Sequence, residues 1–292
     1  MRHGGRSEVA RLRRVLLKHP RDAFLDGGET AESWRDLSWV RAPDLEKAVE
    51  EHDAFRGLLE SLGVRTELLP PHPDTGTDSI YCRDPSIVTD RGVILCRMGK
   101  EARAGEPEAH GAAHRNLGIP VLGEITGSGR LEGGDFVWLD RATAAVGRSY
   151  RTNDEGIRQL ECLLGDEVEL VPVPLPHWKG PSHVFHLMSA FSPLADDLAL
   201  VRSPLLPVPF RELLLSRGTE LVEVAEEELD SLGGNVLAVA PRVGVMLQGN
   251  PVTRSRLEAA GVRVHVYRGE EISVPGSGGP TCLTRPLLRR TE

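Results

Sequence analysis

The feature that most constrains the fold of this 292-residue chain is an internal repeat with a period close to fifty residues. The segments that begin at Glu132 and Gly233 share one order: Gly-Gly, a short apolar strand, a polar or proline-containing turn, and a second strand. A segment with helical spacing and a β-branched strand complete each unit. Looser copies begin near Asp84 and His186. The repeat therefore predicts modules of two strands, a helix and a third strand.

The fifth copy is divided between the two ends of the chain. One strand remains after Cys282, and residues 13–20, a helix and residues 64–70 supply the rest. The helix is expected because apolar or weakly polar residues follow 3,4 spacing between Asp44 and Gly63, which suit its start and its end. They are Leu45, Val49, His52, Phe55, Leu59 and Leu62.

A repeat whose last unit is closed by both termini indicates a ring, since only then do the first and last modules meet. The expected fold is α/β: a five-bladed α/β propeller in one domain over residues 1–292. We expect the helices on the outside and the first strand of each module around the centre. Equivalent strand starts are spaced 47 to 54 residues apart, at Asp84, Glu132, His186, Gly233 and Cys282.

Composition excludes several classes of protein. Lys and Arg total 35 against 43 Asp and Glu, and the net charge of −8 disfavours a general nucleic-acid binder. The N-terminus lacks the apolar stretch of a signal peptide, and the apolar run over 236–247 is interrupted by Pro241 and Arg242. We expect a soluble, cytoplasmic protein without a membrane partner.

The four cysteines form neither a disulfide framework nor the paired spacing of a zinc site. Cys82 and Cys96 are expected in apolar strands of the core. Cys162 lies in an amphipathic helical segment and is also expected to be buried. Cys282 is the exception, because it stands at a strand start.

Two further histidine patterns are weaker. His110 and His114 are four residues apart, as in a helical metal pair, but no Glu follows His110 and the surroundings are rich in Gly and Ala. The pattern favours a solvated helix face over a zinc site. His183 lies three residues before His186; alternation along an expected strand from Val184 to Met188 places position 186 inside the ring.

In a ring, residues at equivalent strand starts converge at one end of the central axis. Asp84, Glu132, His186 and Cys282 would then share one acidic pocket. A lone cysteine is most often a small buried apolar residue, and a lone carboxylate most often belongs to a turn or to the solvated surface. The common spacing instead indicates a catalytic site with two carboxylates, an imidazole and a thiol.

The motifs RDPSIV, EGGDF, RTNDEG, HLMS and GGPTCLTRPL resemble, in order and spacing, those of the guanidino-group-modifying enzymes. This superfamily includes arginine deiminase, dimethylarginine dimethylaminohydrolase and amidinotransferases. The resemblance covers about residues 78–289, and it implies the pentein fold, which is the five-module propeller. It also implies that Cys282 is the nucleophile, His186 the general acid and base, Glu132 its carboxylate partner and Asp84 a ligand of the guanidinium.

The same resemblance implies the residues that bind the rest of the substrate. Asp78 looks like a second carboxylate for the guanidinium, as in the dimethylarginine enzymes. Arg103 and Arg151 match positions that bind the carboxylate of the amino acid. Without the resemblance, Arg151 would be read as a surface arginine paired with a neighbouring acid such as Asp154.

The chemistry explains these residue types. The guanidinium carbon is a poor electrophile, so the reaction needs a thiolate and a firmly held cationic substrate. A covalent thiouronium adduct and then hydrolysis would release citrulline and ammonia or a methylamine, with no metal or organic cofactor. An acid-base histidine would serve both halves of the reaction.

The substrate stays open between arginine, N-methylated arginine and another guanidino compound. Arginine deiminases carry an aspartate two residues after the catalytic histidine, where this chain has Met188. The HLMS and RTN motifs resemble the dimethylarginine enzymes, whereas RDP, EGGD and the cysteine motif resemble arginine deiminase. The alternative activity is amidino transfer to an amine. A binding protein of the same fold, such as the ribosome anti-association factor, would not need the thiol, imidazole and carboxylates. A homodimer also stays open.

Overall fold

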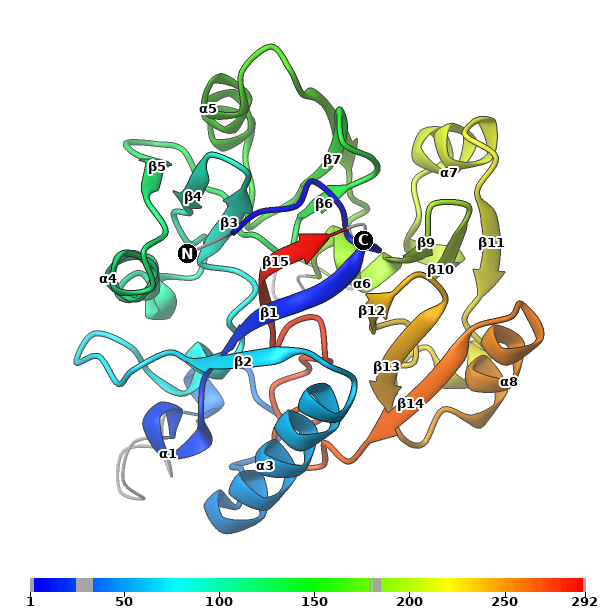
Figure 1. Ribbon diagram of the computed structural model, residues 1–292, viewed down its shortest axis with the longest axis horizontal. Coiled ribbons are helices and arrows are strands. Elements are labelled where there is room, and N and C mark those ends of the chain that lie inside the picture. Colours follow the sequence, from blue (N-terminus) through cyan, green and yellow to red (C-terminus); the bar gives the residue numbers. More distant parts are fainter. Residues whose placement is uncertain (1–2, 25–33, 179, 181–184, 291–292) are drawn as a thin grey trace.

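The computed structural model describes residues 3–24, 34–178, 180 and 185–290. They form five three-stranded sheets around a common centre, with one long helix per module on the outside (Figure 1). In every sheet the middle strand pairs antiparallel with the first strand and parallel with the third. This arrangement is the strand, strand, helix, strand module that the repeat predicts.

The five modules are numbered in the order of their first strands. Module 1 contains β3 (Ser86–Thr89), β4 (Gly92–Leu95), α4 (Glu106–Asn116) and β5 (Val121–Glu124). Module 2 contains β6 (Phe136–Trp138), β7 (Thr143–Arg148), α5 (Asp154–Leu164) and β8 (Glu169–Pro174). Module 3 contains β9 (Phe191–Ala195), β10 (Leu198–Val201), α7 (Val208–Ser216) and β11 (Glu220–Glu223). Module 4 contains β12 (Val236–Ala240), β13 (Val243–Leu247), α8 (Pro251–Ala259) and β14 (Arg263–Tyr267). Module 5 contains β15 (Arg285–Arg290), β1 (Arg11–Leu17), α3 (Leu45–Ser61) and β2 (Arg65–Leu68).

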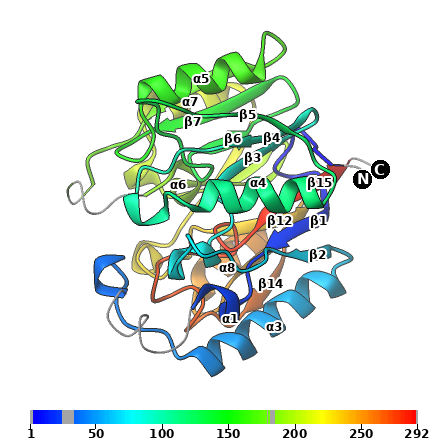
Figure 2. The ribbon, with the colours of Figure 1, turned by 90° about the vertical axis from the view of Figure 1, so that its left-hand side faces the viewer.

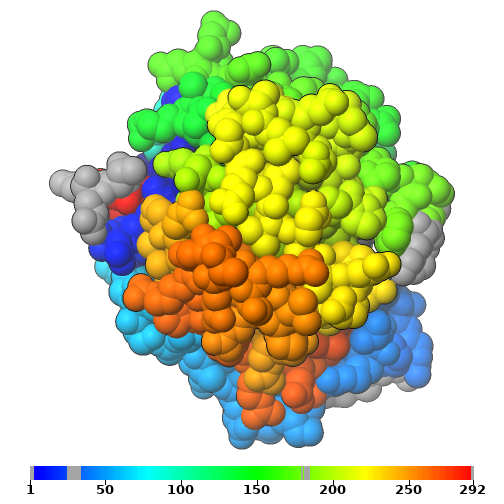
Figure 3. All heavy atoms as spheres, turned by 90° about the vertical axis from the view of Figure 1, so that its right-hand side faces the viewer, coloured from blue at the N-terminus to red at the C-terminus, as the bar shows by residue number. Residues whose placement is uncertain are grey.

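Shorter elements lie within and between the modules. Their bounds are α1 (Pro20–Ala23), η1 (Thr77–Ile80), η2 (Glu101–Arg103), α6 (Leu187–Ala190), η3 (Ser203–Leu205) and η4 (Glu226–Glu228). Seen from the side, α5, α4 and α3 follow one another along the outer surface (Figure 2). The outer surfaces of modules 3 and 4 lie directly against each other (Figure 3).

Module 5 closes the ring with both ends of the chain, as predicted. Strand β1 pairs antiparallel with β15 and parallel with β2. Its helix α3 begins where the sequence indicates: the side chain of Asp44 accepts a hydrogen bond from the Lys47 amide, and Gly63 follows the helix with a φ of +83°. The first strands surround the centre, and every residue of β3, β6, β9 and β12 is buried. Strands covered on both faces have this continuous burial.

Two expectations about buried faces are wrong. Cys162 is exposed, because the buried face of α5 contains Leu160 and Leu164 and a residue two positions from Leu160 lies on the opposite side of the helix. His110 and His114 are not on a solvated face: they are 1% and 0% exposed. The small residues around them let α4 pack closely against β4 and β5 of its own module.

The remaining buried side chains agree better with expectation. Cys82 and Cys96 are buried, although each lies just outside a strand. The Ser86 hydroxyl lies 3.1 Å from His110 Nδ1 and 3.3 Å from His114 Nε2, so both imidazoles have a polar partner in the core. No helix in the described part of the chain combines the length and the apolar character needed to cross a bilayer.

Candidate active site

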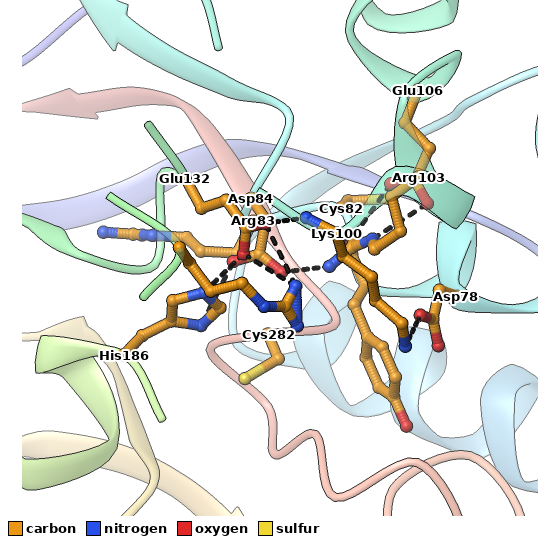
Figure 4. A network of polar contacts seen from close by, with 12 residues as sticks. Asp78, Cys82, Arg83, Asp84, Lys100, Arg103, Glu106, Glu132, His186 and Cys282 are labelled. Atoms are coloured by element: carbon orange, nitrogen blue, oxygen red, sulfur yellow. Dashed lines mark hydrogen bonds and ion pairs between the residues drawn. The ribbon is translucent and has the colours of Figure 1, made fainter. Parts of the chain in front are cut away.

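The segment before the first strand of every module reaches the same end of the ring. These segments carry Asp84, Glu132, His186, Asn235 and Cys282, one from each module. Ligand atoms of Asp84, Glu132 and His186 lie within 4.8 Å of one another, and Cys282 lies beside this group (Figure 4). The ring geometry thus brings together residues that are far apart in the sequence.

Glu132 and His186 form the central hydrogen bond. His186 Nε2 lies 2.7 Å from Glu132 Oε2. The other carboxylate oxygen accepts hydrogen bonds from the amides of Gly99 (2.9 Å) and Lys100 (3.2 Å). Burial of Glu132 opposes its charge, but the hydrogen bond to His186 and the charge of Arg151 outweigh burial and lower its pKa. This carboxylate therefore stays ionised and fixed in orientation.

The imidazole lies between two carboxylates. His186 Nδ1 is 3.6 Å from Asp84 Oδ1, on the side opposite Glu132. Burial alone would lower the pKa of His186, but the charge of Asp84 and the hydrogen bond to Glu132 raise it to about 9. Burial likewise opposes the charge of Asp84, yet His186 and Arg103 lower its pKa to about 2. Near neutral pH the resting site holds an imidazolium.

The local backbone of His186 differs from the expected strand. The residue precedes the one-turn helix α6, and β9 begins only at Phe191. The Leu187 amide donates to Asp135 Oδ1 at 2.9 Å, which holds the turn in place. A side-chain acceptor for this amide favours the turn over a continued strand. Val184 and His183 lie outside the described residues.

The Gly-Gly step before β6 is required by close packing. A Cβ atom at Gly134 would lie 2.6 Å from both Asp84 Oδ1 and His186 Nδ1. A Cβ atom at Gly133 would lie 2.5 Å from the Arg83 carbonyl oxygen. The two glycines thus let the Glu132 segment approach the neighbouring modules closely enough for the carboxylates to reach the imidazole.

Cys282 is a neutral thiol in this arrangement. Burial, followed by the charge of Asp84, raises its pKa to about 11. Asn235 Nδ2 lies 3.4 Å from Sγ, and Asn235 Oδ1 accepts a hydrogen bond from the Thr281 amide at 3.0 Å. Asn235 was missed from the sequence, although it follows the Gly233 strand start by two residues. It both positions the cysteine loop and contacts the sulfur.

Arg103 does not fit its predicted role as ligand of a substrate carboxylate. The side chain is 4% exposed and its guanidinium is fully engaged within the protein. It donates to Asp84 Oδ2 at 2.5 Å, to both oxygens of Glu106 and to the Tyr81 carbonyl. Glu106, three residues later, was missed; burial raises its pKa to about 7 although Arg103 opposes this shift. Arg103 instead fixes the orientation of Asp84.

Asp78 is buried and paired with a cation that sequence reasoning did not single out. Its Oδ2 atom is 2.5 Å from Lys100 Nζ, and its Oδ1 atom accepts a 2.7 Å hydrogen bond from Trp39 Nε1. Lys100 also donates to the Leu37 carbonyl. In Figure 4, Lys100 and Asp78 lie on the Arg103 side of the site, away from His186.

Arg151 contacts Glu132 and not Asp154. Its Nη1 atom lies 3.1 Å and 3.4 Å from the two oxygens of Glu132, and its side chain is 19% exposed. Asp154 pairs with Arg148. The Arg151 side chain is thus partly exposed, with its charged group directed to Glu132.

Two clusters of described residues have ligand atoms close enough for a metal ion: Asp84, Glu132 and His186, and separately His19, His52 and Asp53. In the first cluster both carboxylates already contact guanidinium groups, those of Arg103 and Arg151. These neighbouring positive charges disfavour a cation at this place.

Residues 36 to 289 match the family model described as N,N dimethylarginine dimethylhydrolase, eukaryotic. The chain belongs to this family. It is 28% identical over 281 residues to the N(G),N(G)-dimethylarginine dimethylaminohydrolase of Pseudomonas aeruginosa, covering 94% of this chain and 98% of that enzyme. It is 26% identical over 267 residues to the arginine deiminase of Listeria welshimeri, covering 77% and 65% of the two chains.

Solved structures give the same result. A cysteine-to-serine variant of the Pseudomonas aeruginosa enzyme, complexed with citrulline, has a TM-score of 0.73 at 25% identity and is covered in full, with 96% of this chain. An amidinotransferase from Microseira wollei, of the saxitoxin biosynthetic pathway, shares the fold with a TM-score of 0.81 at 18% identity, over 99% and 98% of the chains. The predicted superfamily, the pentein fold and the class of C–N hydrolase acting on linear amidines are confirmed.

The packing at Gly134 gives a stability prediction. Gly134→Ala should lower the free energy of unfolding by about 1–3 kcal/mol, because its methyl group would meet two fixed polar side chains. Gly57→Ala is the matched control: position 57 is on α3 with open space around it, so alanine should stabilise by about 0.5–1 kcal/mol. Urea unfolding measures both, and equal changes in the two variants would contradict the packing argument.

Proposed function

We propose that this protein hydrolyses the guanidino group of free arginine or an N-methylated arginine, and releases citrulline together with ammonia or a methylamine. The observation that carries the proposal is the imidazolium of His186, held between Glu132 and Asp84 beside the Cys282 thiol. A family member with this arrangement has the acid, the nucleophile and the anionic pocket that the reaction requires.

Cys282 is the proposed nucleophile, and the substrate itself promotes its ionisation. The charge of Asp84 contributes to the raised pKa of the thiol. A guanidinium bound against Asp84 would offset that charge and favour the thiolate. The thiol proton passes to solvent as substrate binds, and the thiolate sulfur then attacks the guanidinium carbon and forms a C–S bond.

His186 is the proposed acid and base. As imidazolium it gives its proton to the departing ammonia or amine while the C–N bond breaks, which leaves a covalent thiouronium adduct on Cys282. The neutral imidazole next removes a proton from water, and the hydroxide attacks the same carbon. The C–S bond then breaks, and the hydroxyl proton leaves to the thiolate or to solvent as the ureido carbonyl forms. Glu132 orients the ring and stabilises its charged form in both halves.

Asp84 and Asp78 are the proposed ligands of the guanidinium. Their carboxylates can each accept charge-assisted hydrogen bonds from its nitrogens. In the structure Lys100 pairs with Asp78, so substrate must replace that ammonium group as the partner of the carboxylate. Arg103 keeps Asp84 in place by donating a hydrogen bond to its Oδ2 atom.

Arg151 is the proposed ligand of the substrate's α-carboxylate. Its partly exposed side chain beside Glu132 supports this role, and the planar guanidinium suits a carboxylate. The role requires the side chain to leave Glu132 for the substrate. A cytoplasmic location, a single domain over residues 1–292 and a homodimer stay predictions.

Hydrolysis is favoured over amidino transfer by the relatives. The Pseudomonas aeruginosa relative and the arginine deiminase relatives are named as hydrolytic enzymes, whereas the amidinotransferase likeness at 18% identity concerns the fold alone. Both reactions share the covalent first half, so the choice depends on whether water or an amine attacks the adduct.

Cys282→Ser should reduce turnover to less than about one hundredth of the native rate, because a hydroxyl is a far weaker nucleophile at neutral pH. The assay is citrulline release from arginine, monomethylarginine and dimethylarginine, with arginine plus glycine as a separate test for amidino transfer. Cys162→Ser, at an exposed cysteine, is the matched control and should keep full activity. A serine variant at position 282 that retains activity would remove the nucleophile from the proposal.

Lys100→Met should lower KM for the accepted substrate by about tenfold with little change in kcat, because substrate would no longer compete with a charge-assisted pair at Asp78. Lys47→Met, at an exposed lysine on α3, should change neither constant. Steady-state kinetics on both variants gives the answer. A tenfold increase in KM would instead place Lys100 among the direct ligands of the substrate.

A further inference from the structure

A small polar cavity lies beside Arg83, on the other side of the Asp84 segment from the candidate active site. Its volume is about 20 Å³, and Glu8, Arg83, Arg285 and Arg289 contribute to its lining. Figure 4 shows the Arg83 side chain extending from the Asp84 segment to the side opposite Arg103. None of these four side chains takes part in the proposed reaction.

The charge of the lining is unbalanced. Arg83, Arg285 and Arg289 are 1%, 4% and 3% exposed, and Glu8 is the one carboxylate among the residues around the cavity. Glu8 Oε1 lies 2.7 Å from Arg83 Nη2, so it neutralises one guanidinium. Arginine keeps its proton inside proteins, so two positive charges remain buried there.

These two guanidinium groups have neutral hydrogen-bond acceptors, and the nearby charges of Glu8 and Asp84 offset their burial only in part. Arg285 donates to the Arg83 carbonyl, and Arg289 donates to the carbonyls of Ala10 and Ala238, which are neutral acceptors. Burial, with the charge of Arg83 next, lowers the pKa of Arg285 to about 9, and burial lowers the pKa of Arg289 to about 10. Such a cluster gains free energy from a nearby negative charge.

Unused hydrogen-bond donors are present as well. The Nε atoms of Arg83, Arg285 and Arg289 are buried and have no hydrogen-bond partner among the described residues. Buried donors of this kind are normally satisfied. Three unpartnered N–H groups on three cationic side chains around one cavity form a built site for an anion.

We propose that this cavity binds a single monatomic anion, which is chloride at physiological salt. A volume of about 20 Å³ accommodates roughly one water-sized particle. This space suits one monatomic anion better than the larger phosphate or sulfate ion.

The N-terminal segment closes one side of the site. Gly4 donates to the Leu287 carbonyl at 2.9 Å and accepts from the Arg289 amide at 2.8 Å. Gly5 has a φ of +114°, and a Cβ atom there would lie 2.4 Å from the Arg289 carbonyl oxygen. Only glycine allows this close passage over β15. The anion would thus join the N-terminal segment to β15 and to module 1.

The site is connected to the catalytic loops through the backbone. The Arg83 amide donates to the Cys282 carbonyl at 3.1 Å, and Arg285 donates to the Arg83 carbonyl. Asp84 is the next residue. An anion that holds these arginines in place would stabilise the loops that carry Asp84 and Cys282, so we expect its main effect on stability.

Halide titrations of the full chain test the proposal. At constant ionic strength, replacing sodium gluconate with sodium chloride or bromide should decrease the unfolding equilibrium constant about tenfold once halide is roughly ten times its Kd. Gluconate is too large for the cavity. The response should saturate, and it should be lost in Arg289→Gln. Arg14→Gln is the matched control, since Arg14 is equally buried but pairs with Glu67 away from the cavity, and it should respond like the native protein.

A crystal of the native protein grown in bromide gives a test that does not depend on variants. An anomalous bromide peak in the cavity, within hydrogen-bonding distance of the guanidinium groups, supports the proposal. An empty cavity at about 0.5 M bromide overturns it, as does a halide response that gluconate reproduces or that Arg289→Gln retains.

Discussion

The hydrogen bond between Glu132 and His186 is the interaction on which the rest of the site depends. It joins module 2 to module 3, and it needs a buried carboxylate whose second oxygen is already held by the amides of Gly99 and Lys100. Gly134 allows the two segments to meet, and Asp135 holds the turn that presents the imidazole. Because burial opposes every charge in this group, the imidazolium persists only while both carboxylates stay in place. The fold thus maintains a proton on His186, which in the proposed function passes to the leaving group.

In the absence of substrate, cations of the protein itself balance the negative charges of the site. Each carboxylate of the site contacts a cation of the protein: Lys100 for Asp78, Arg103 for Asp84 and Arg151 for Glu132. The ion pair between Arg103 and Asp84 is deeply buried, whereas the long side chains of Lys100 and Arg151 are partly exposed. A cationic substrate can replace the exposed partners but not Arg103. In the proposed function, substrate binding therefore releases Lys100 and Arg151 from their carboxylates, whereas Arg103 continues to support Asp84.

The sequence predicted the architecture because the repeat expresses one packing solution five times, including the module divided between the termini. The repeat also located Asp84, Glu132 and His186, since each precedes the first strand of its module. Lys100 and Glu106 could not be found in this way, because neither stands at a strand start and their importance arises only from the partners that they contact in space, Asp78 and Arg103. Arg103 was assigned by resemblance, which could not reveal that Glu106 engages it. Cys162 was misplaced because its phase on α5 was not considered: Leu160 and Leu164 mark the buried face, and position 162 lies on the other side. His110 and His114 were misplaced because the Gly- and Ala-containing helix α4 leaves its buried face ambiguous from sequence.

The most direct measurement is an NMR titration of the His186 imidazole in the protein without substrate. The account predicts a pKa of about 9 in the native chain, and a decrease to about 6.5 or below in Glu132→Gln, because burial then acts with less opposing charge. The structure of the variant should be checked by its spectrum, so that a loss of folding is distinguished from a change of titration. A native His186 that titrates near 6.5, or one whose pKa is unchanged by Glu132→Gln, would contradict the claim that the buried carboxylates hold the catalytic proton.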